Sequence, residues 1–366
     1  MTLVFTIFSA VLGAVVGSFL NACIHRMPRG VGLLNPRRSF CPSCNKVIPW
    51  YENIPILSWI FLRGRCAGCK APIPVRYLIV ELLTAGLFTA SWQFFGYPQS
   101  IAYWAFLALL VAATFIDLEH FIIPDEITLG GTMLGVALCL AVPELMGTGS
   151  RLLAGGLSIA GAVVGFGVVF LVVEGGKLAF GKIRHRFPDG ESFEWRRAGD
   201  EVEIRIGDET LVWQDVFSRE KDKLSLFLDG PVSIDGCESK AARMDFFHNR
   251  ALVDGEPLDL AKVEGISGRA SMVVVPREAM GFGDVKFMAC IGAFLGWQAV
   301  LFTLFTASII GSIAGLAGLF LARDRAGVRI PFGPFLALGA VLWLFGGSDL
   351  MDWYFAALRD FRGGDF

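Results

Sequence analysis

Two aspartates at the ends of apolar runs carry the strongest chemical signal in this sequence. Asp117 closes the apolar run 101–116, and Asp284 follows Gly281-Phe-Gly just before the apolar run 287–295. A carboxylate costs roughly 2.5–3.5 kcal/mol at the centre of a membrane helix, so two of them at helix ends suggest a site. A carboxylate pair can share one proton and activate water. The pattern therefore favours an intramembrane aspartyl hydrolase as the first hypothesis.

The neighbours of the two aspartates have residue types that would support such a site. Gly281 and Gly283 permit a positive φ and let a substrate or backbone approach Asp284 closely. Lys286 lies two residues further on, where it could tune the local field or bind a lipid phosphate. Asp125 follows a proline, which marks a helix boundary, and it is expected to start or cap the next span.

Four cysteines form two C-x-x-C pairs, Cys41 with Cys44 and Cys66 with Cys69, with 21 residues between the pairs. Each pair can point two thiolates at one ion, and two pairs complete the tetrahedral site of a structural zinc. A redox role for one C-x-x-C pair stays open, but it does not explain the duplication. Since a closed four-thiolate site has no open position, the metal is expected to organise this loop rather than to catalyse.

The elements that must position these residues are membrane helices. The chain has 366 residues, of which 54% are hydrophobic, and its mean hydropathy is +0.58, which no soluble domain of this size needs. The first apolar run lacks a basic segment before it, so a retained helix is favoured over a cleaved signal peptide. We expect an all-α polytopic membrane protein of about eight transmembrane helices. The expected spans are 3–23, 77–95, 101–117, 127–146, 152–175, 283–297, 299–321 and 331–347.

Charges between the spans predict the topology. Nine Lys and Arg residues but only one Glu lie between the first two spans, so this loop is expected to be cytoplasmic and the N-terminus outside. Alternation then places Asp117 and Asp284 at cytoplasmic helix ends, as a working pair requires. The basic loop 323–329 falls on the cytoplasmic side by the same alternation, which supports the assignment.

One internal region differs from the rest in composition. Residues 182–276 hold 14 Lys and Arg and 19 Asp and Glu, about half the charges of the chain. Segments 201–206, 224–228 and 271–275 have strand patterns, with Asp-Gly turns between them. We expect a small soluble β-rich domain inserted in a cytoplasmic loop, with either a docking role or none. The expected parts are 1–25 (first helix), 26–76 (zinc loop), 77–175 (helices), 176–279 (insertion), 280–348 (helices) and 349–366 (tail).

Together these motifs resemble the type IV prepilin peptidases, the bacterial leader peptidases of type IV pili and type II secretion. The resemblance covers about 1–175 and 277–345, and the insertion at 176–276 departs from the family pattern. Besides the two C-x-x-C pairs, the matching segments are Gly17-Ser-Phe-Leu-Asn-Ala-Cys-Ile-His-Arg-Met-Pro28, Asn53-Ile-Pro-Ile-Leu-Ser-Trp59, Pro72-Ile-Pro-Val-Arg-Tyr-Leu-Ile-Val-Glu81, Ile116-Asp-Leu-Glu-His-Phe-Ile-Ile-Pro-Asp125 and Gly281-Phe-Gly-Asp-Val-Lys286.

The resemblance implies an aspartyl endopeptidase of the bacterial inner membrane, with Asp117 and Asp284 as its catalytic pair. Such an enzyme cuts prepilins and pseudopilins after a glycine that precedes their hydrophobic segment. Many members also methylate the new N-terminus with S-adenosylmethionine. The candidate region for this second activity contains Gly17, Asn21, Arg26 and Glu81. A peptidase without methyl transfer is the alternative.

The remaining expectations concern partners and competing functions. Glu81, Glu119 and Asp125 are candidates to bind basic residues of the leader, since the basic loop itself would repel them. Membrane lipids are expected partners, and nucleic acid is not. A proton-coupled transporter would place carboxylates near the bilayer midplane and leaves the cysteines unexplained. A non-catalytic pilus or secretion scaffold, with structural aspartates, is the other alternative.

Overall fold

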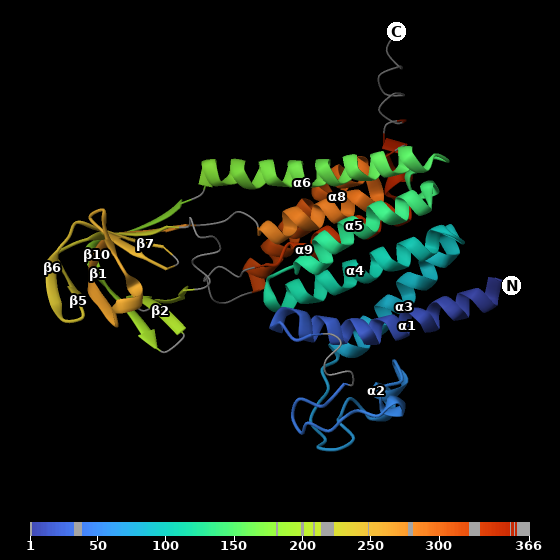
Figure 1. The fold of residues 1–366 in the computed structure, drawn as a ribbon, viewed down its shortest axis with the longest axis horizontal. Helices are drawn as coiled ribbons and strands as arrows, with labels where there is room; N and C mark the ends of the chain where they lie inside the picture. The colour runs from blue at the N-terminus through green and yellow to red at the C-terminus, as the bar shows by residue number, and fades with distance from the viewer. Residues whose placement is uncertain are drawn as a thin grey trace, which may run out of the picture. The chain divides into compact units, whose positions relative to one another are not determined.

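The computed structural model describes residues 2–32, 39–180, 182–198, 201–207, 209–213, 223–247, 249–276, 281–321, 330–351, 353–354 and 356. The chain forms two compact units (Figure 1). The first, called the helical unit, comprises Met1–Phe170 and Met280–Phe366. The second, called the sheet unit, is Leu171–Ala279. The basic loop 323–329 and most of the tail 349–366 lie outside the described residues.

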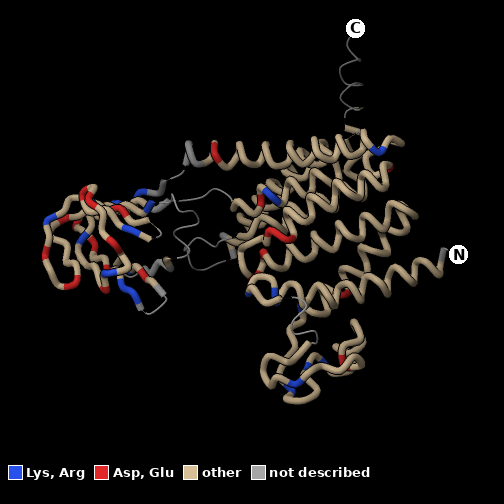
Figure 2. The backbone as a smooth tube through the Cα atoms, in the orientation of Figure 1, with Lys and Arg blue, Asp and Glu red and all other residues tan. Residues whose placement is uncertain are grey.

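The helical unit consists mainly of long apolar helices that pack side by side (Figure 1). Along them charged residues are sparse, whereas the strands of the sheet unit carry many (Figure 2). The long helices are α1 Thr2–Arg26, α3 Arg76–Phe95, α4 Gln99–His120, α5 Asp125–Ala141, α6 Arg151–Phe180, α8 Phe282–Leu321 and α9 Gly333–Leu342. A π-helical turn, Trp343–Gly347, extends α9.

The number of spanning helices differs from the expected eight. Six helices of the described chain are long and apolar enough to cross a membrane. The expected span 127–146 is α5, which has only 17 residues because it starts after Pro124 and ends just before Pro143. The expected spans 283–297 and 299–321 form one element, α8, whose backbone leaves the helical conformation at Gly296. The positive φ of 82° there suits glycine, which has no Cβ.

Glycines let these helices approach closely. A Cβ on Gly17 of α1 would lie 2.8 Å from the Cα of Glu81 on α3. A Cβ on Gly161 of α6 would overlap the carbonyl of Gly292 on α8. Small residues at such contacts allow backbone-to-backbone packing in lipid, where no hydrophobic effect drives helices together. Gly17 and Gly161 therefore allow α1 to pack closely on α3 and α6 on α8.

The sheet unit confirms the β-rich insertion expected from the sequence, so the all-α description applies to the helical unit alone. Its described strands form an antiparallel sheet with the order β3-β2-β1-β10-β4-β7-β8-β9, and β5 pairs with β10 and β6. The strand patterns expected at 201–206 and 224–228 are β2 and β4, and 271–275 lies in β10. The bounds are β1 Lys182–Ala198, β2 Glu201–Ile206, β3 Glu209–Val212, β4 Leu224–Leu228, β5 Pro231–Ile234, β6 Cys237–Lys240, β7 Arg243–Phe246, β8 Ala251–Val253, β9 Glu256–Leu258 and β10 Gly265–Pro276.

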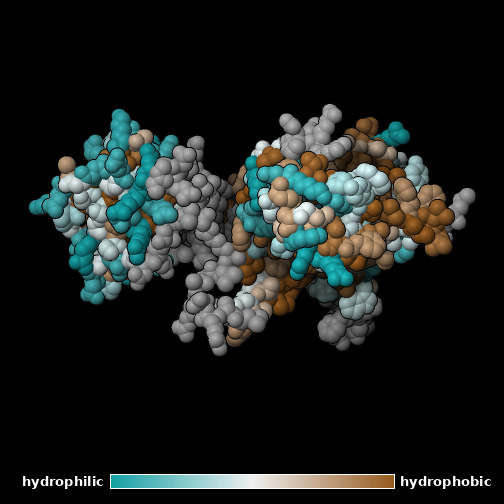
Figure 3. Space-filling view, turned by 90° about the horizontal axis from the view of Figure 1, so that it is seen from below, coloured by the Kyte–Doolittle hydropathy of each residue, from teal (hydrophilic) through white to brown (hydrophobic). Residues whose placement is uncertain are grey.

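The sheet unit has its own hydrophobic core. Trp195, Trp213 and Phe246 pack edge to face at its centre, with ring centroids 5.6–6.0 Å apart. The face that Figure 3 shows is mostly hydrophilic on the sheet unit, whereas on the helical unit it has large hydrophobic areas beside a hydrophilic patch. This contrast fits one unit in water and one in lipid.

Candidate active sites

The first expected catalytic residue, Asp117, lies in the last turn of α4 and is only 5% exposed. Its Oδ2 accepts a hydrogen bond of 2.9 Å from the backbone N–H of Gly333, the first residue of α9. A carboxylate at the C-terminal end of its own helix is unfavourable to that helix's dipole. The N-terminus of α9 offers the opposite, favourable end, so α9 compensates the misplaced charge of Asp117.

The second expected catalytic residue, Asp284, lies in the first turn of α8 and is also buried. Here the acid stands at a helix N-terminus, where the dipole favours it. Its backbone N–H donates to the carbonyl of Gly281 at 3.2 Å. The expected G-x-G-D segment therefore forms the tight entry into α8.

The structure brings the two aspartates together, although 166 residues of the printed sequence separate them. Their carboxyl groups are close enough to interact electrostatically. Ile123, from the turn between α4 and α5, lies against both flanking glycines. A Cβ on Gly283 would lie 3.4 Å from the Cβ of Ile123, and one on Gly333 would lie 3.0 Å from its Cδ1. The absence of a side chain at both glycines thus lets Ile123 pack closely beside the two carboxyl groups.

An ion pair between Lys286 and Asp125 joins α8 to α5 near the two aspartates Asp117 and Asp284. Lys286 Nζ lies 2.6 Å from Asp125 Oδ1, and Asp125 is the first residue of α5. The ammonium also stands 5.2 Å from the centroid of the Phe282 ring. Of the two roles expected for Lys286, this geometry favours tuning the local field, because the ion pair occupies its charge next to the site.

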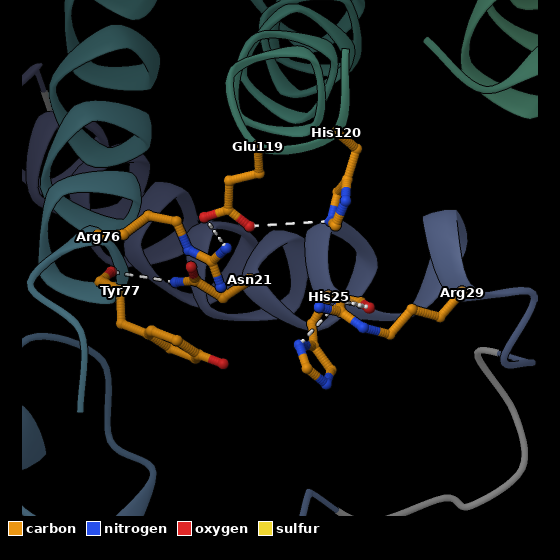
Figure 4. A network of polar contacts seen from close by, with 7 residues as sticks. All are labelled: Asn21, His25, Arg29, Arg76, Tyr77, Glu119 and His120. Carbon is orange, nitrogen blue, oxygen red and sulfur yellow. Dashed lines mark hydrogen bonds and ion pairs between the residues drawn. The ribbon is translucent and has the colours of Figure 1, made fainter. Parts of the chain in front are cut away.

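A polar network lies where α1, α3 and α4 meet (Figure 4). The Arg76 guanidinium pairs with the carboxylate of Glu119, and Asn21 Nδ2 donates to the carbonyl of Tyr77 at 3.0 Å. These contacts fix the start of α3 to α1 and to the end of α4, two residues beyond Asp117. They also change the expectation for basic leader residues. Since Glu119 and Asp125 already hold cations, a leader residue would have to replace an internal partner.

The four expected zinc ligands converge on one point. All four Sγ atoms of Cys41, Cys44, Cys66 and Cys69 lie within 4.8 Å of one another. The Sγ atoms of Cys41 and Cys69 are 3.8 Å apart. A tetrahedron with Zn–S bonds of about 2.3 Å requires S–S edges of about 3.8 Å, so these thiols fit zinc.

The two halves of this cluster repeat one backbone pattern. Asn45 N–H donates to the Cys41 carbonyl at 2.8 Å, and Lys70 N–H donates to the Cys66 carbonyl at 3.0 Å. Both donors have a left-handed backbone, at φ 56° and 62°. In the first turn the backbone N–H groups of Ser43 and Cys44 lower the pKa of Cys41 to about 6, which favours the thiolate that a metal binds. The duplication supports a metal centre over a redox pair.

The candidate methyltransferase residues lie around two cavities that share Asn53 and Ile54 in their linings. One cavity, of about 160 Å³, is lined by Glu81, and the other, of about 430 Å³, by Arg26. Buried Glu81 accepts a 2.6 Å hydrogen bond from the backbone N–H of Ile56. Gly17 permits the close contact of α1 with α3 at Glu81. Buried Asn21 has no hydrogen-bond partner for its Oδ1 among the described residues.

Three residues at these sites were not singled out from the sequence. Gly333 donates to Asp117, Ile123 packs against Gly283 and Gly333, and Ile56 donates to Glu81 from a left-handed backbone at φ 64°. This φ is unusual for a β-branched residue and marks a constrained position. Each of the three has a proline nearby in the sequence, before Ile56, after Ile123 and on each side of Phe332 and Gly333.

Substitution Gly333→Ala is expected to lower kcat for prepilin cleavage by about 10²-fold, since misplacing a reacting group by about 1 Å can cost that much. The new Cβ would lie 2.6 Å from Asp117 Oδ2, so the carboxyl group must move. The measurement is initial cleavage rates of purified protein in lipid. Gly130→Ala on α5 is the control, because a Cβ there meets nothing within 4 Å. An unchanged kcat for Gly333→Ala would contradict the role of Gly333.

Comparison with known proteins decides the family. The model described as the bacterial peptidase A24 N-terminal domain matches residues 11–95, which include the zinc loop and Glu81. The model of the type IV leader peptidase family matches residues 104–184 and 247–316, which include both aspartates. The chain belongs to the type IV leader peptidase family. The two models together match more than half of the chain and leave out most of the sheet unit.

Curated relatives of this leader peptidase are similar over most of its length. A prepilin leader peptidase/N-methyltransferase of Myxococcus xanthus is 32% identical, over 89% of this chain and 66% of the relative. Relatives with the same name from Aeromonas hydrophila and Legionella pneumophila are 29% and 27% identical, each over 93% of this chain and 90% of the relative. No solved structure matches.

Proposed function

We propose that this leader peptidase is an intramembrane aspartyl endopeptidase that cleaves prepilins and type II secretion pseudopilins after a glycine. The observation that carries the proposal is the pairing of Asp117 and Asp284. Two buried carboxyl groups from helices far apart in sequence lie close enough to interact electrostatically, and Gly283, Gly333 and Ile123 pack beside them. Nothing in helix packing requires two acids there, because buried charges are costly.

The proposed chemistry uses one ionised and one protonated carboxyl group. The ionised group takes a proton from water, whose oxygen attacks the scissile carbonyl carbon, while the protonated group gives its proton to the carbonyl oxygen. The group that took a proton from water then gives this proton to the leaving amine. The other group takes its proton back from the former carbonyl oxygen as the C–N bond breaks. The N–H of Gly333 holds one Asp117 oxygen in place during this exchange, which leaves the other oxygen to face the reactants.

The proposed setting is the bacterial inner membrane. The six long apolar helices, the short α5 and the break of α8 at Gly296 are compatible with eight crossings. The charge asymmetry of the loops supports an N-terminus outside and a cytoplasmic zinc loop and sheet unit. In this topology both aspartates lie near the cytoplasmic face, where a positively charged leader would enter.

We further propose that the N-terminal region methylates the new N-terminus and that zinc organises it. S-adenosylmethionine, when bound, supplies the methyl group. The cavity of about 430 Å³ fits a ligand of this class, for which pockets of about 300–1,000 Å³ are usual. Arg26 in its lining complements a carboxylate, and Ser18 and Asn53 add hydroxyl and amide groups. Gly17 and Asn21 position α1 against α3 there.

Glu81 is proposed to bind the new N-terminal amine and to take its proton. An ammonium has no lone pair, so it must lose a proton before nitrogen can accept a methyl group. The Ile56 N–H fixes one Glu81 oxygen, and the carboxylate lines the smaller cavity. This proposal assigns Glu81 to the new N-terminal amine in place of a basic leader residue.

Substitution Glu81→Gln is therefore expected to reduce methyl transfer by about 10²–10⁴-fold, the usual contribution of a general base, and to leave cleavage unchanged. Mass spectrometry of the product N-terminus measures both activities in one reaction. Glu52→Gln is the matched control, since Glu52 lines the same cavity but pairs with Lys46 at 2.9 Å. Full methylation by Glu81→Gln, or equal losses in both variants, would contradict the assignment.

A further inference from the structure

The segment between the two cysteine pairs exposes large apolar side chains. Trp50 and Phe61 are each 80% exposed, and Tyr51, Leu57 and Ile60 are at least half exposed. A 3₁₀ helix, Trp50–Glu52, and the short helix α2, Leu57–Phe61, carry them. By contrast, the described side chains between residues 184 and 274 of the sheet unit include no exposed large hydrophobic one. A surface of this kind marks an interaction site.

This segment, Trp50–Phe61, lies beside the membrane helices rather than beyond their ends (Figure 1). Trp50, Asn53, Ile54 and Pro55 line the 430 Å³ cavity together with α1 residues from Arg26 back to Val15. Arg26 lies eleven residues after Val15 in α1, which corresponds to about 16 Å along the helix axis. Since the hydrocarbon core is about 30 Å thick, a segment packed along this stretch of α1 reaches membrane depth.

The backbone N–H groups in the middle of the segment are all paired within the protein, as lipid contact demands. Between Asn53 and Ser58 every backbone N–H has an acceptor within the protein. Asn53 donates to the Trp50 carbonyl, Ile54 to Ser58 Oγ, Leu57 to the Pro55 carbonyl and Ser58 to the Ile54 carbonyl, at 2.6–3.1 Å. Ile56, with its constrained φ, donates to the Glu81 carboxylate, and Pro55 has no N–H. A loop in water has no such need, whereas non-helical backbone at membrane depth does.

The charges next to the segment specify which part of the bilayer it meets. Arg63, Arg65 and Lys70 follow α2 directly, and Glu52, the one acid within Trp50–Phe61, pairs with Lys46 at 2.9 Å. Aromatic side chains flanked by Lys and Arg are typical of the interface between hydrocarbon and anionic headgroups. A groove for a soluble protein partner would not require this combination of depth, backbone closure and positive charge.

We propose that Trp50–Phe61 is an interfacial membrane segment, whose exposed face contacts acyl chains of the leaflet at the Arg26 end of α1, under anionic headgroups. This inference concerns how the zinc loop is seated, and it does not depend on either catalytic assignment. It revises the expectation of a wholly cytoplasmic loop at 26–76. The segment then shields the Glu81 cavity from the bilayer on one side.

Photocrosslinking in nanodiscs tests the proposal. Full-length protein carrying p-benzoylphenylalanine at Phe61 is reconstituted in phosphatidylethanolamine and phosphatidylglycerol, irradiated and analysed by mass spectrometry. The matched control carries the same group at Phe247, a partly exposed phenylalanine of the sheet unit. We expect lipid adducts at position 61, enriched in phosphatidylglycerol, and none at 247. Bound zinc measured in both samples shows that the loop is folded.

Three outcomes would overturn the inference. The first is the absence of lipid adducts at position 61 in zinc-loaded protein. The second is crosslinking of position 61 only to protein, which would make the surface a docking site for another chain. The third is equal lipid labelling at 61 and 247, which would show that labelling is nonspecific. If the variant at 61 loses its zinc, the probe at Trp50 repeats the test at the other exposed end of the segment.

Discussion

Asp117→Asn and Asp284→Asn are each expected to slow prepilin cleavage by purified protein in lipid severely. Each substitution removes one of two groups that exchange protons with water and the scissile bond, a loss of about 10²–10⁴-fold in rate for one group. Asparagine keeps the shape and can still accept the hydrogen bond from Gly333, so the fold around position 117 should remain. Product analysis by mass spectrometry checks the result.

The control for this pair is Glu126→Gln, which removes one negative charge from an exposed residue at the start of α5. Its cleavage rate should equal that of the wild type. Both Asp variants should still methylate a pilin that was cleaved beforehand, because Glu81 lies on α3, outside the aspartate pair. Cleavage that survives in both Asp variants would mean that the pair is structural, and the scaffold interpretation would then be favoured.

Removing one zinc ligand, by Cys41→Ser or Cys66→Ser, is expected to eliminate bound metal and methyl transfer together. Structural zinc contributes an apparent binding free energy of about 10–16 kcal/mol in small zinc domains, so a site with three thiolates should not hold the loop folded. The loop carries Ile56, which fixes Glu81, and Asn53, which lines both cavities. Metal analysis and methyl transfer to a cleaved pilin are the two measurements.

Cleavage should be affected much less than methylation in these variants, since Asp117 and Asp284 lie on α4 and α8 and not on the loop. Cys237→Ser, in an exposed strand of the sheet unit, is the matched control and should retain both metal and methylation. Wild-type protein without metal but with four intact thiols would refute the zinc assignment. Full methylation without metal would separate zinc from the activity.

Local sequence patterns identified the residues that chemistry makes expensive or recognisable. Asp117 and Asp284 stood out because acids are rare beside apolar runs, and the four cysteines because two C-x-x-C pairs suit one tetrahedral ion. Alternating residues at 201–206 predicted β2, since period two is a local property of a strand. The count of spanning helices was less secure, because helix ends depend on prolines and on the break at Gly296.

The sequence by itself determined the apolar helices, the inserted sheet region, the two acids and the four thiols, because each depends on residue type and short spacing. Only the tertiary structure decided which groups donate hydrogen bonds to the buried carboxylates. The Gly333 N–H reaches Asp117 across 216 residues, and the Ile56 N–H reaches Glu81 across 25. Both donors are backbone groups, which every residue except proline possesses, so no residue type marks them. Their roles arise from helix packing and loop closure, which bring distant backbone to the carboxylates.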